Sequence, residues 1–228
     1  MLNVIAINGS PNMEKGRTAM VLSPFLEGLE AQGADIGLYY ASRLKVKPCS
    51  CGKLHCWNTT PGECIFQDSM QILYPKLRKA NLLVIATPIY IPLPGDLQNV
   101  INRLVALLEP EIRFEDGRTR AHFRDDVQIE KVVLAASGGW WEKENFDTVI
   151  RIAEELTAVA GIPFGGAIIR PHSQLMIKDG KMTPQGQDVV QAIHRAGVEL
   201  VELGEIRQET LEEIRQPLIS QEDYFGRW

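Results

Sequence analysis

The chain has 228 residues, a formal net charge of -5, 45% hydrophobic residues and 23% charged residues. This length and composition allow one substantial core, so a single α/β domain over residues 1–228 is expected. The negative charge argues against nonspecific binding to nucleic acid or to an anionic membrane, because both require an excess of Lys and Arg. Small molecules are the expected partners.

Short apolar segments alternate with longer amphipathic segments along the chain. The first apolar segment, at 4–7, is too short and too soon interrupted by Gly9 to serve as a secretion signal, and no apolar run approaches membrane-spanning length. We therefore expect a cytoplasmic protein. The other strand candidates lie at 35–40, 82–87, 132–136 and 165–169, and the helix candidates lie at 18–32, 68–79, 96–108, 144–160 and 184–203.

This alternation predicts a doubly wound, five-stranded parallel sheet with helices on both faces. The continuous apolar character of the strands suits a sheet that is covered on both sides. Such sheets bind ligands beyond the carboxyl ends of their strands, so the loops to inspect are 8–17, 87–95 and 137–145. Three segments have no assigned element: a cysteine loop at 43–66, an insertion at 109–128 and a C-terminal extension at 204–228, whose aromatic end could dock on a second subunit.

The first loop, at 8–17, leaves a strand and enters a helix. Its backbone N–H groups and the positive end of the helix dipole can converge on an anion, with help from the side chains of Ser10, Asn12 and Thr18. Arg17 can add charge or point outward. The glycine spacing fits neither a Walker loop nor a dinucleotide fingerprint. A phosphate is the ligand that fits, and an ordinary capped loop is the alternative.

The other two loops offer surfaces for a ring. In the loop at 87–95, prolines stiffen the chain, the N–H groups of Ile89 and Tyr90 could meet the polar edge of a ring, and Tyr90 could lie against its face. The loop at 137–145 begins with small residues that allow close approach to the backbone. Each of its two Trp residues could cover a ligand or be buried between subunits. Arg103, in the helix candidate that follows the loop at 87–95, is expected at the surface or at an interface.

All four cysteines of the chain lie in the cysteine loop, at Cys49, Cys51, Cys56 and Cys64. In a reducing compartment such clustering indicates metal or redox chemistry before disulfides. Four thiolates can ligate a [4Fe–4S] cluster. Zinc is a second option, although Cys49-x-Cys51 is tight for a zinc knuckle, and a redox pair or structural thiols are a third. His55 could replace one cysteine ligand.

Together these motifs resemble the iron–sulfur flavoprotein group of the NAD(P)H-dependent FMN reductase superfamily, which has a flavodoxin-like fold. The resemblance covers residues 1–170, and the segments that carry it are Asn8–Pro11 with Gly16 and Thr18, Cys49–Cys64, Asp68–Met70, Ala86–Tyr90, Asn102–Arg103 and Ser137–Gly139. Cluster-binding members of that group look like C-x2-C-x2-C followed by a longer gap. Here Cys51 is displaced by one residue, and Asn12 stands where a basic residue is common.

The resemblance implies an FMN-dependent oxidoreductase or electron-transfer flavoprotein in which NAD(P)H is a transient co-substrate and no side chain acts as a nucleophile. It also implies a homodimer or homotetramer. A cluster-free NAD(P)H:FMN or quinone reductase and a cofactor-less interaction module with zinc remain open. The implied FMN ligands are Ser10, Asn12, Arg17 and Thr18 at the phosphate and Pro88, Ile89, Tyr90, Ser137, Gly138 and Gly139 around the ring; the candidate metal ligands are Cys49, Cys51, Cys56 and Cys64.

Overall fold

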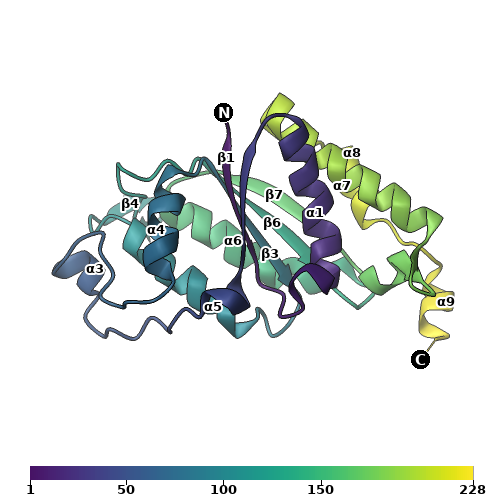
Figure 1. Cartoon of the computed structure of the whole chain (residues 1–228), viewed down its shortest axis with the longest axis horizontal. Helices are drawn as coiled ribbons and strands as arrows, with labels where there is room; N and C mark the ends of the chain where they lie inside the picture. Colours follow the sequence, from purple (N-terminus) through teal and green to yellow (C-terminus); the bar gives the residue numbers. More distant parts are fainter. Residues whose placement is uncertain (228) are drawn as a thin grey trace.

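Five parallel strands form the central sheet of the structure, a computed structural model that describes residues 1–227 (Figure 1). The strand order is β2-β1-β3-β6-β7, which confirms the predicted doubly wound sheet of flavodoxin-like type. The strands are β1 (Asn3–Asn8), β2 (Asp35–Tyr40), β3 (Leu82–Pro88), β6 (Lys131–Ser137) and β7 (Phe164–Arg170).

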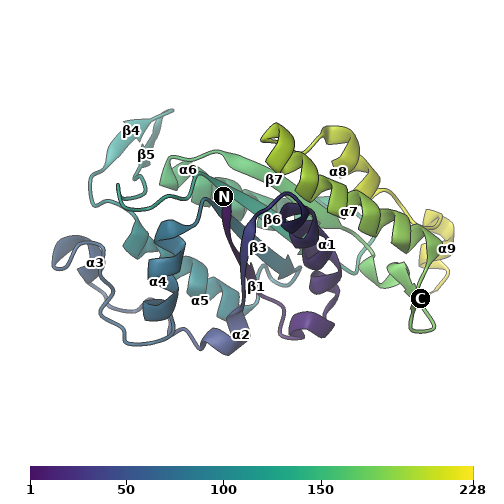
Figure 2. The ribbon, with the colours of Figure 1, turned by 45° about the horizontal axis from the view of Figure 1, so that its top comes forward.

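Helices cover both faces of this sheet, as Figures 1 and 2 show. Helices α1 and α7 pack on one face with α8 beside α7, and helices α4, α5 and α6 pack on the other. None of the helices within residues 1–227 has the length and apolar character that crossing a membrane requires. The long helices are α1 (Arg17–Ala31), α4 (Met70–Lys79), α5 (Gly95–Arg103), α6 (Asp147–Ala160), α7 (Pro184–Leu203) and α8 (Gln208–Arg215).

Successive side chains of a strand point to opposite faces of the sheet, so each strand contributes to two separate cores. In β1, Val4 and Ala6 join the core beneath α1 and α7, whereas Ile5 and Ile7 join the core beneath α4 and α5. Because both faces need apolar side chains, the strand reads as a continuous apolar run. The two cores hold the sheet rigid, and its carboxyl edge is therefore a fixed platform for loops.

The segments that had no assigned element contain short regular elements. The insertion folds into a β-hairpin, and the C-terminal extension contains α8 and a short α9; Trp228 lies outside the described residues. The helix expected at 96–108 ends as an α-helix at Arg103 and continues as one 3-10 turn. The short elements are α2 (Ala41–Leu44), α3 (His55–Asn58), α9 (Gln221–Phe225), β4 (Arg113–Glu115), β5 (Arg118–Arg120), β8 (Ile177–Lys178), β9 (Lys181–Met182) and the 3-10 turns Met13–Lys15, Leu104–Leu107, Lys143–Phe146 and Ser173–Met176.

Candidate functional site

The three loops singled out in the sequence meet at the carboxyl edge of the sheet. β1 and β3 are neighbours there, while the chain continues from β1 to β2 on one side and from β3 to β6 on the other, which makes this the switch point. The Gly9 N–H donates to the Ala86 carbonyl at 2.7 Å, and the hydroxyl oxygens of Thr18 and Ser137 are 3.0 Å apart. The first turn of α1 is thus in direct contact with the end of β6, where the third loop begins.

The first loop forms a tight cradle in front of α1. Ser10 is buried, its N–H donates to Asn8 Oδ1 at 2.8 Å, and its Oγ accepts from the Asn12 N–H at 3.3 Å. A Cβ at Gly16 would lie only 2.6 Å from Ser10 Oγ, so a glycine is required for this close approach. The Asn12 and Arg17 side chains are exposed, so only Ser10 and Thr18 of the four predicted phosphate ligands are buried in the cradle.

The amino end of α1 suits a bound phosphate. The residue before the helix, Gly16, offers no side chain to cap it, and no side-chain cap hydrogen bond is present. The first N–H groups of any helix lack intrahelical acceptors, and together with the helix dipole they favour an anion. The first turn of α1 can therefore hold an anion such as a phosphate group.

A cavity of about 370 Å³ lies between the second and third loops. No charged side chain lines it, so its chemistry suits a neutral planar ring. Tyr90 is 50% exposed and Trp140 is 70% exposed at its margin, which leaves both side chains accessible to a ligand. The lining residues are Ile89, Tyr90, Ile91, Gly138, Gly139, Trp140, Asn145 and Phe146.

The backbone of the second loop differs from the expectation. The Ile89 N–H donates to the Ser137 carbonyl and the Tyr90 N–H to the Pro92 carbonyl, both at 3.0 Å. These bonds fold the loop on itself and against β6, so neither N–H is open to a ring edge. The sequence could not show this, because proline positions alone do not reveal which carbonyl each remaining N–H reaches.

Two residues that were not predicted from the sequence, Ser173 and Gln174, bind the backbone of the third loop. Ser173 Oγ donates to the Gly138 carbonyl at 3.0 Å, and Gln174 Nε2 donates to the Gly139 carbonyl at 2.8 Å. Both donors follow β7, the strand next to β6 in the sheet. Their only signal in the sequence is their place after a strand, at the edge where ligands bind.

The four cysteines come together in the cysteine loop. With His55 they line one small cavity of about 10 Å³. Burial of Cys56, followed by the neighbouring thiols of Cys64, Cys51 and Cys49, raises the pKa of Cys56 to about 11. The donor set suits a thiophilic metal or an iron–sulfur cluster. Within residues 1–227, however, no group of three or more His, Cys, Asp or Glu side chains is arranged to hold a metal ion.

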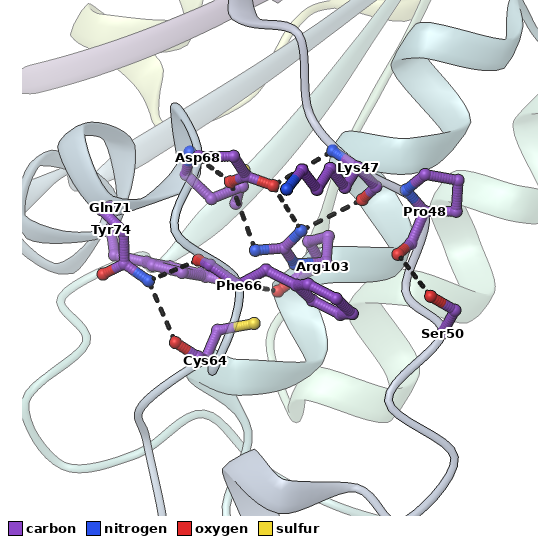
Figure 3. Close-up of polar contacts among 10 residues, drawn as sticks. Lys47, Pro48, Ser50, Cys64, Phe66, Asp68, Gln71, Tyr74 and Arg103 are labelled. Carbon is purple, nitrogen blue, oxygen red and sulfur yellow. Dashed lines mark hydrogen bonds and ion pairs between the residues drawn. The ribbon is translucent and has the colours of Figure 1, made fainter.

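Arg103 anchors the cysteine loop to α5, as Figure 3 shows. Its side chain is completely buried, so the expectation of a surface or interface residue is wrong. Arg103 Nη1 donates to Asp68 Oδ2 at 2.8 Å and to the Lys47 carbonyl at 3.0 Å, and its guanidinium lies 5.0 Å from the centre of the Phe66 ring. Lys47 and Asp68 flank the four cysteines, so one guanidinium ties both ends of the loop together.

Asp68 completes this anchor. Its carboxylate accepts the N–H groups of Lys47 and Met70, both at 3.0 Å, so it also binds the first N–H group of α4. Burial acts to raise the pKa of Asp68, but hydrogen bonds from Arg103, Lys47 and Met70 outweigh it and lower the pKa on balance. Asp68 is therefore held as a carboxylate opposite a buried cation.

These features define a flavodoxin-like α/β protein with a loop suited to an anion and an uncharged cavity at the carboxyl edge of the sheet. The NADPH-dependent FMN reductase family matches residues 2–174. The chain belongs to this family, as its motifs predict.

Two archaeal proteins are similar to this chain in sequence. An iron–sulfur flavoprotein of Archaeoglobus fulgidus is 30% identical over 117 residues, which cover 50% of this chain and 57% of that protein. One from Methanocaldococcus jannaschii is 29% identical over 120 residues, which cover 51% of this chain and 58% of that protein. The matched segment thus spans little more than half the length of these curated relatives.

Solved structures with the same fold are more distant in sequence. A putative quinone reductase from Klebsiella pneumoniae is similar with a TM-score of 0.67, 14% identity and coverage of 90% of this chain and 87% of the other. An FMN-dependent NADH-azoreductase from Bacillus anthracis, solved in complex with FMN, is similar with a TM-score of 0.60, 14% identity and coverage of 88% and 99%. At such identities the likeness establishes the fold.

Proposed function

We propose that this protein is an FMN-dependent oxidoreductase that takes electrons from NAD(P)H and delivers them to a small-molecule or protein acceptor. One observation carries the proposal. In a chain of the FMN reductase family, the uncapped amino end of α1 and an uncharged cavity lie at the same carboxyl edge of the sheet, where the hydroxyl oxygens of Thr18 and Ser137 are 3.0 Å apart.

The residues of the first loop would bind the FMN phosphate. Ser10 and Thr18 would donate hydroxyl hydrogen bonds, and the first-turn N–H groups of α1 would add the helix dipole. The exposed side chains of Asn12 and Arg17 would have to turn inward to contribute, so we place them at the rim of the phosphate subsite.

The second and third loops would orient the ring and exclude water from it. Pro88, Ile89 and Tyr90 would lie on one side and the Ser137–Gly139 backbone on the other. When bound, FMN supplies hydride acceptance and the ability to release electrons singly or in pairs. No nucleophilic side chain is needed, and the protein contributes orientation and an apolar surround.

A second part of the proposal concerns the cysteine loop, which we assign to a [4Fe–4S] cluster held by Cys49, Cys51, Cys56 and Cys64. The support is that all four thiols line one cavity and that the relatives named above are iron–sulfur flavoproteins. The thiols do not converge on one point as they stand, so loading a cluster would require rearrangement within the loop. A cluster-free NAD(P)H:FMN or quinone reductase and a zinc-bound module are the alternatives.

Three further expectations belong with this proposal, on oligomeric state, on location in the cytoplasm and on partners. A homodimer or homotetramer would bring a second cysteine loop near the ring, and the clustered cysteines suit the reducing cytoplasm. Neither nucleic acid nor a membrane is an expected partner, given the net charge of -5.

An anaerobic visible spectrum with iron, sulfide and zinc analysis tests both parts. Flavin bands with a broad shoulder near roughly 400 nm and about four irons per chain support the full proposal. Flavin without metal, together with rapid NAD(P)H oxidation, supports the cluster-free reductase. A colourless protein that contains zinc and does not bind added FMN would overturn the proposal.

A further inference from the structure

The C-terminal extension, which lies beyond the family match at residues 2–174, returns to the proposed flavin site. Tyr224 of α9 is 4% exposed, and its hydroxyl donates to the Gly139 carbonyl at 2.8 Å. Gly139 lines the ring-sized cavity. The aromatic end expected to dock on a second subunit therefore docks, at least at Tyr224, on its own chain.

Aromatic packing fixes the position of Tyr224. The Trp141 ring stacks on His172 with centroids 4.8 Å apart, and the Tyr224 ring lies 5.3 Å from Trp141 and 6.1 Å from His172. Trp141 belongs to the third loop and His172 follows β7. The tyrosine is thus wedged between two loops at the carboxyl edge, and its hydroxyl has a defined direction.

A buried cation holds the preceding segment against the sheet. Arg170, at the end of β7, is 0% exposed, and its Nη1 donates to the Gln216 carbonyl at 2.9 Å and also to the Ile214 carbonyl. It forms no ion pair with a carboxylate among residues 1–227, and its acceptors are backbone carbonyls and the Nε2 atom of His172. These bonds fix the chain a few residues before α9 begins.

Gly139 therefore has two side-chain donors on one carbonyl, Tyr224 Oη and Gln174 Nε2, each at 2.8 Å. Two donors on one oxygen restrict rotation of that peptide plane. Gly138 and Gly139 would otherwise sample many backbone conformations, because neither has a Cβ. A loop that is ordered before the ring arrives loses less entropy on binding.

We propose that Tyr224 is a positioning residue for the flavin ring: it holds the Gly139 peptide and so presets the Gly138–Trp140 wall of the cavity. This inference rests on the proposed FMN site. The C-terminal extension is then a built-in brace of the ring subsite, with Arg170 anchoring the chain and Tyr224 making the contact.

The test compares Tyr224→Phe with Tyr74→Phe in the full chain. Tyr74 is also buried, and its hydroxyl also donates to a backbone carbonyl, that of Arg103 at 2.9 Å. It lies on α4, on the side of the molecule where α3 lies, whereas α9 lies at the opposite end in both views (Figures 1 and 2). Both variants lose the same kind of hydrogen bond, and only one loses it at the ring subsite.

The readouts are the FMN dissociation rate, the visible circular dichroism of bound FMN, the melting temperature and hydrogen exchange of residues 138–141 without FMN. Tyr224→Phe should release FMN about three- to tenfold faster, because the loss of one hydrogen bond corresponds to about that factor in rate. It should also change the visible dichroism of bound FMN and speed hydrogen exchange in residues 138–141. Tyr74→Phe should lower the melting temperature at least as much and change none of the other three.

Three results would count against the inference. If Tyr224→Phe releases FMN at the wild-type rate and with unchanged exchange, the brace does not exist. Equal changes in both variants would show that general stability, and not position, is responsible. If the wild-type chain binds no FMN at all, the proposed function fails and the flavin role of Tyr224 fails with it, a result distinct from the first two.

Discussion

The loops at the carboxyl edge of the sheet, here called the flavin edge because FMN is proposed to bind there, are built differently from the cysteine loop, although both regions are made of irregular backbone. The loops of the flavin edge start from buried parallel strands, and their contacts, such as the Thr18 hydroxyl 3.0 Å from that of Ser137, follow from the strand order. The cysteine loop contains the short helix α3 and is held by side-chain hydrogen bonds, among them those of the buried Arg103 guanidinium and of Gln71. Strand order fixes the first region, and a few side chains fix the second.

The substitution with the largest expected effect removes Arg103, the residue that anchors the cysteine loop. Arg103→Met leaves the buried Asp68 carboxylate without its cation, so the free energy of unfolding should fall by about 3–5 kcal/mol. Asp126→Asn removes an exposed carboxylate that pairs with Arg78. The free energy of unfolding should then fall by less than about 1 kcal/mol. Urea unfolding measures both, and a loss below about 1 kcal/mol for Arg103→Met would show that the anchor is not needed.

A second substitution attacks the phosphate cradle. In Gly16→Ala the new Cβ would lie 2.6 Å from Ser10 Oγ, so FMN affinity should fall roughly tenfold or more as the loop is displaced. Gly95→Ala is the matched control, because a Cβ there meets nothing within 4 Å. FMN titration by flavin fluorescence compares the two. Equal affinities would mean that the phosphate lies elsewhere.

A third substitution tests the contact between the first turn of α1 and the end of β6. Thr18→Val leaves the buried Ser137 hydroxyl without its partner, which should cost about 1–3 kcal/mol, shared between unfolding and FMN binding. Thr18→Ser keeps the hydroxyl and should recover most of both. Failure of the serine variant to do so would show that the methyl group, and not the hydroxyl, matters.

The anchor also predicts a small dependence on pH. The pKa of Asp68 is lowered in the folded protein, so near its ordinary pKa of 3.8 the unfolded chain binds more protons. Its contribution is therefore present above about that pH and is lost as the pH falls through the lower folded pKa. Asp68→Asn should flatten this part of the stability profile measured by urea unfolding between pH 3 and 6; an unchanged slope would contradict the assignment.

The same contrast explains what could be predicted from the sequence. Apolar runs such as 82–87 indicate buried parallel strands, and in a doubly wound sheet the loops that follow these strands lie along one carboxyl edge. The burial of Arg103 depends on Asp68, which lies 35 positions away, and the role of Tyr224 depends on Gly139, which lies 85 positions away. Such pairings follow from tertiary packing, and no local pattern encodes them.

The most direct test of the central claim is the FMN content and affinity of the wild-type chain, purified anaerobically and titrated with FMN. We predict one tightly bound FMN per chain, with affinity lowered by Gly16→Ala and by Thr18→Val and unaffected by Gly95→Ala. A chain that binds no FMN, or that binds it equally well in all four forms, would contradict the assignment of the switch-point edge as the flavin site.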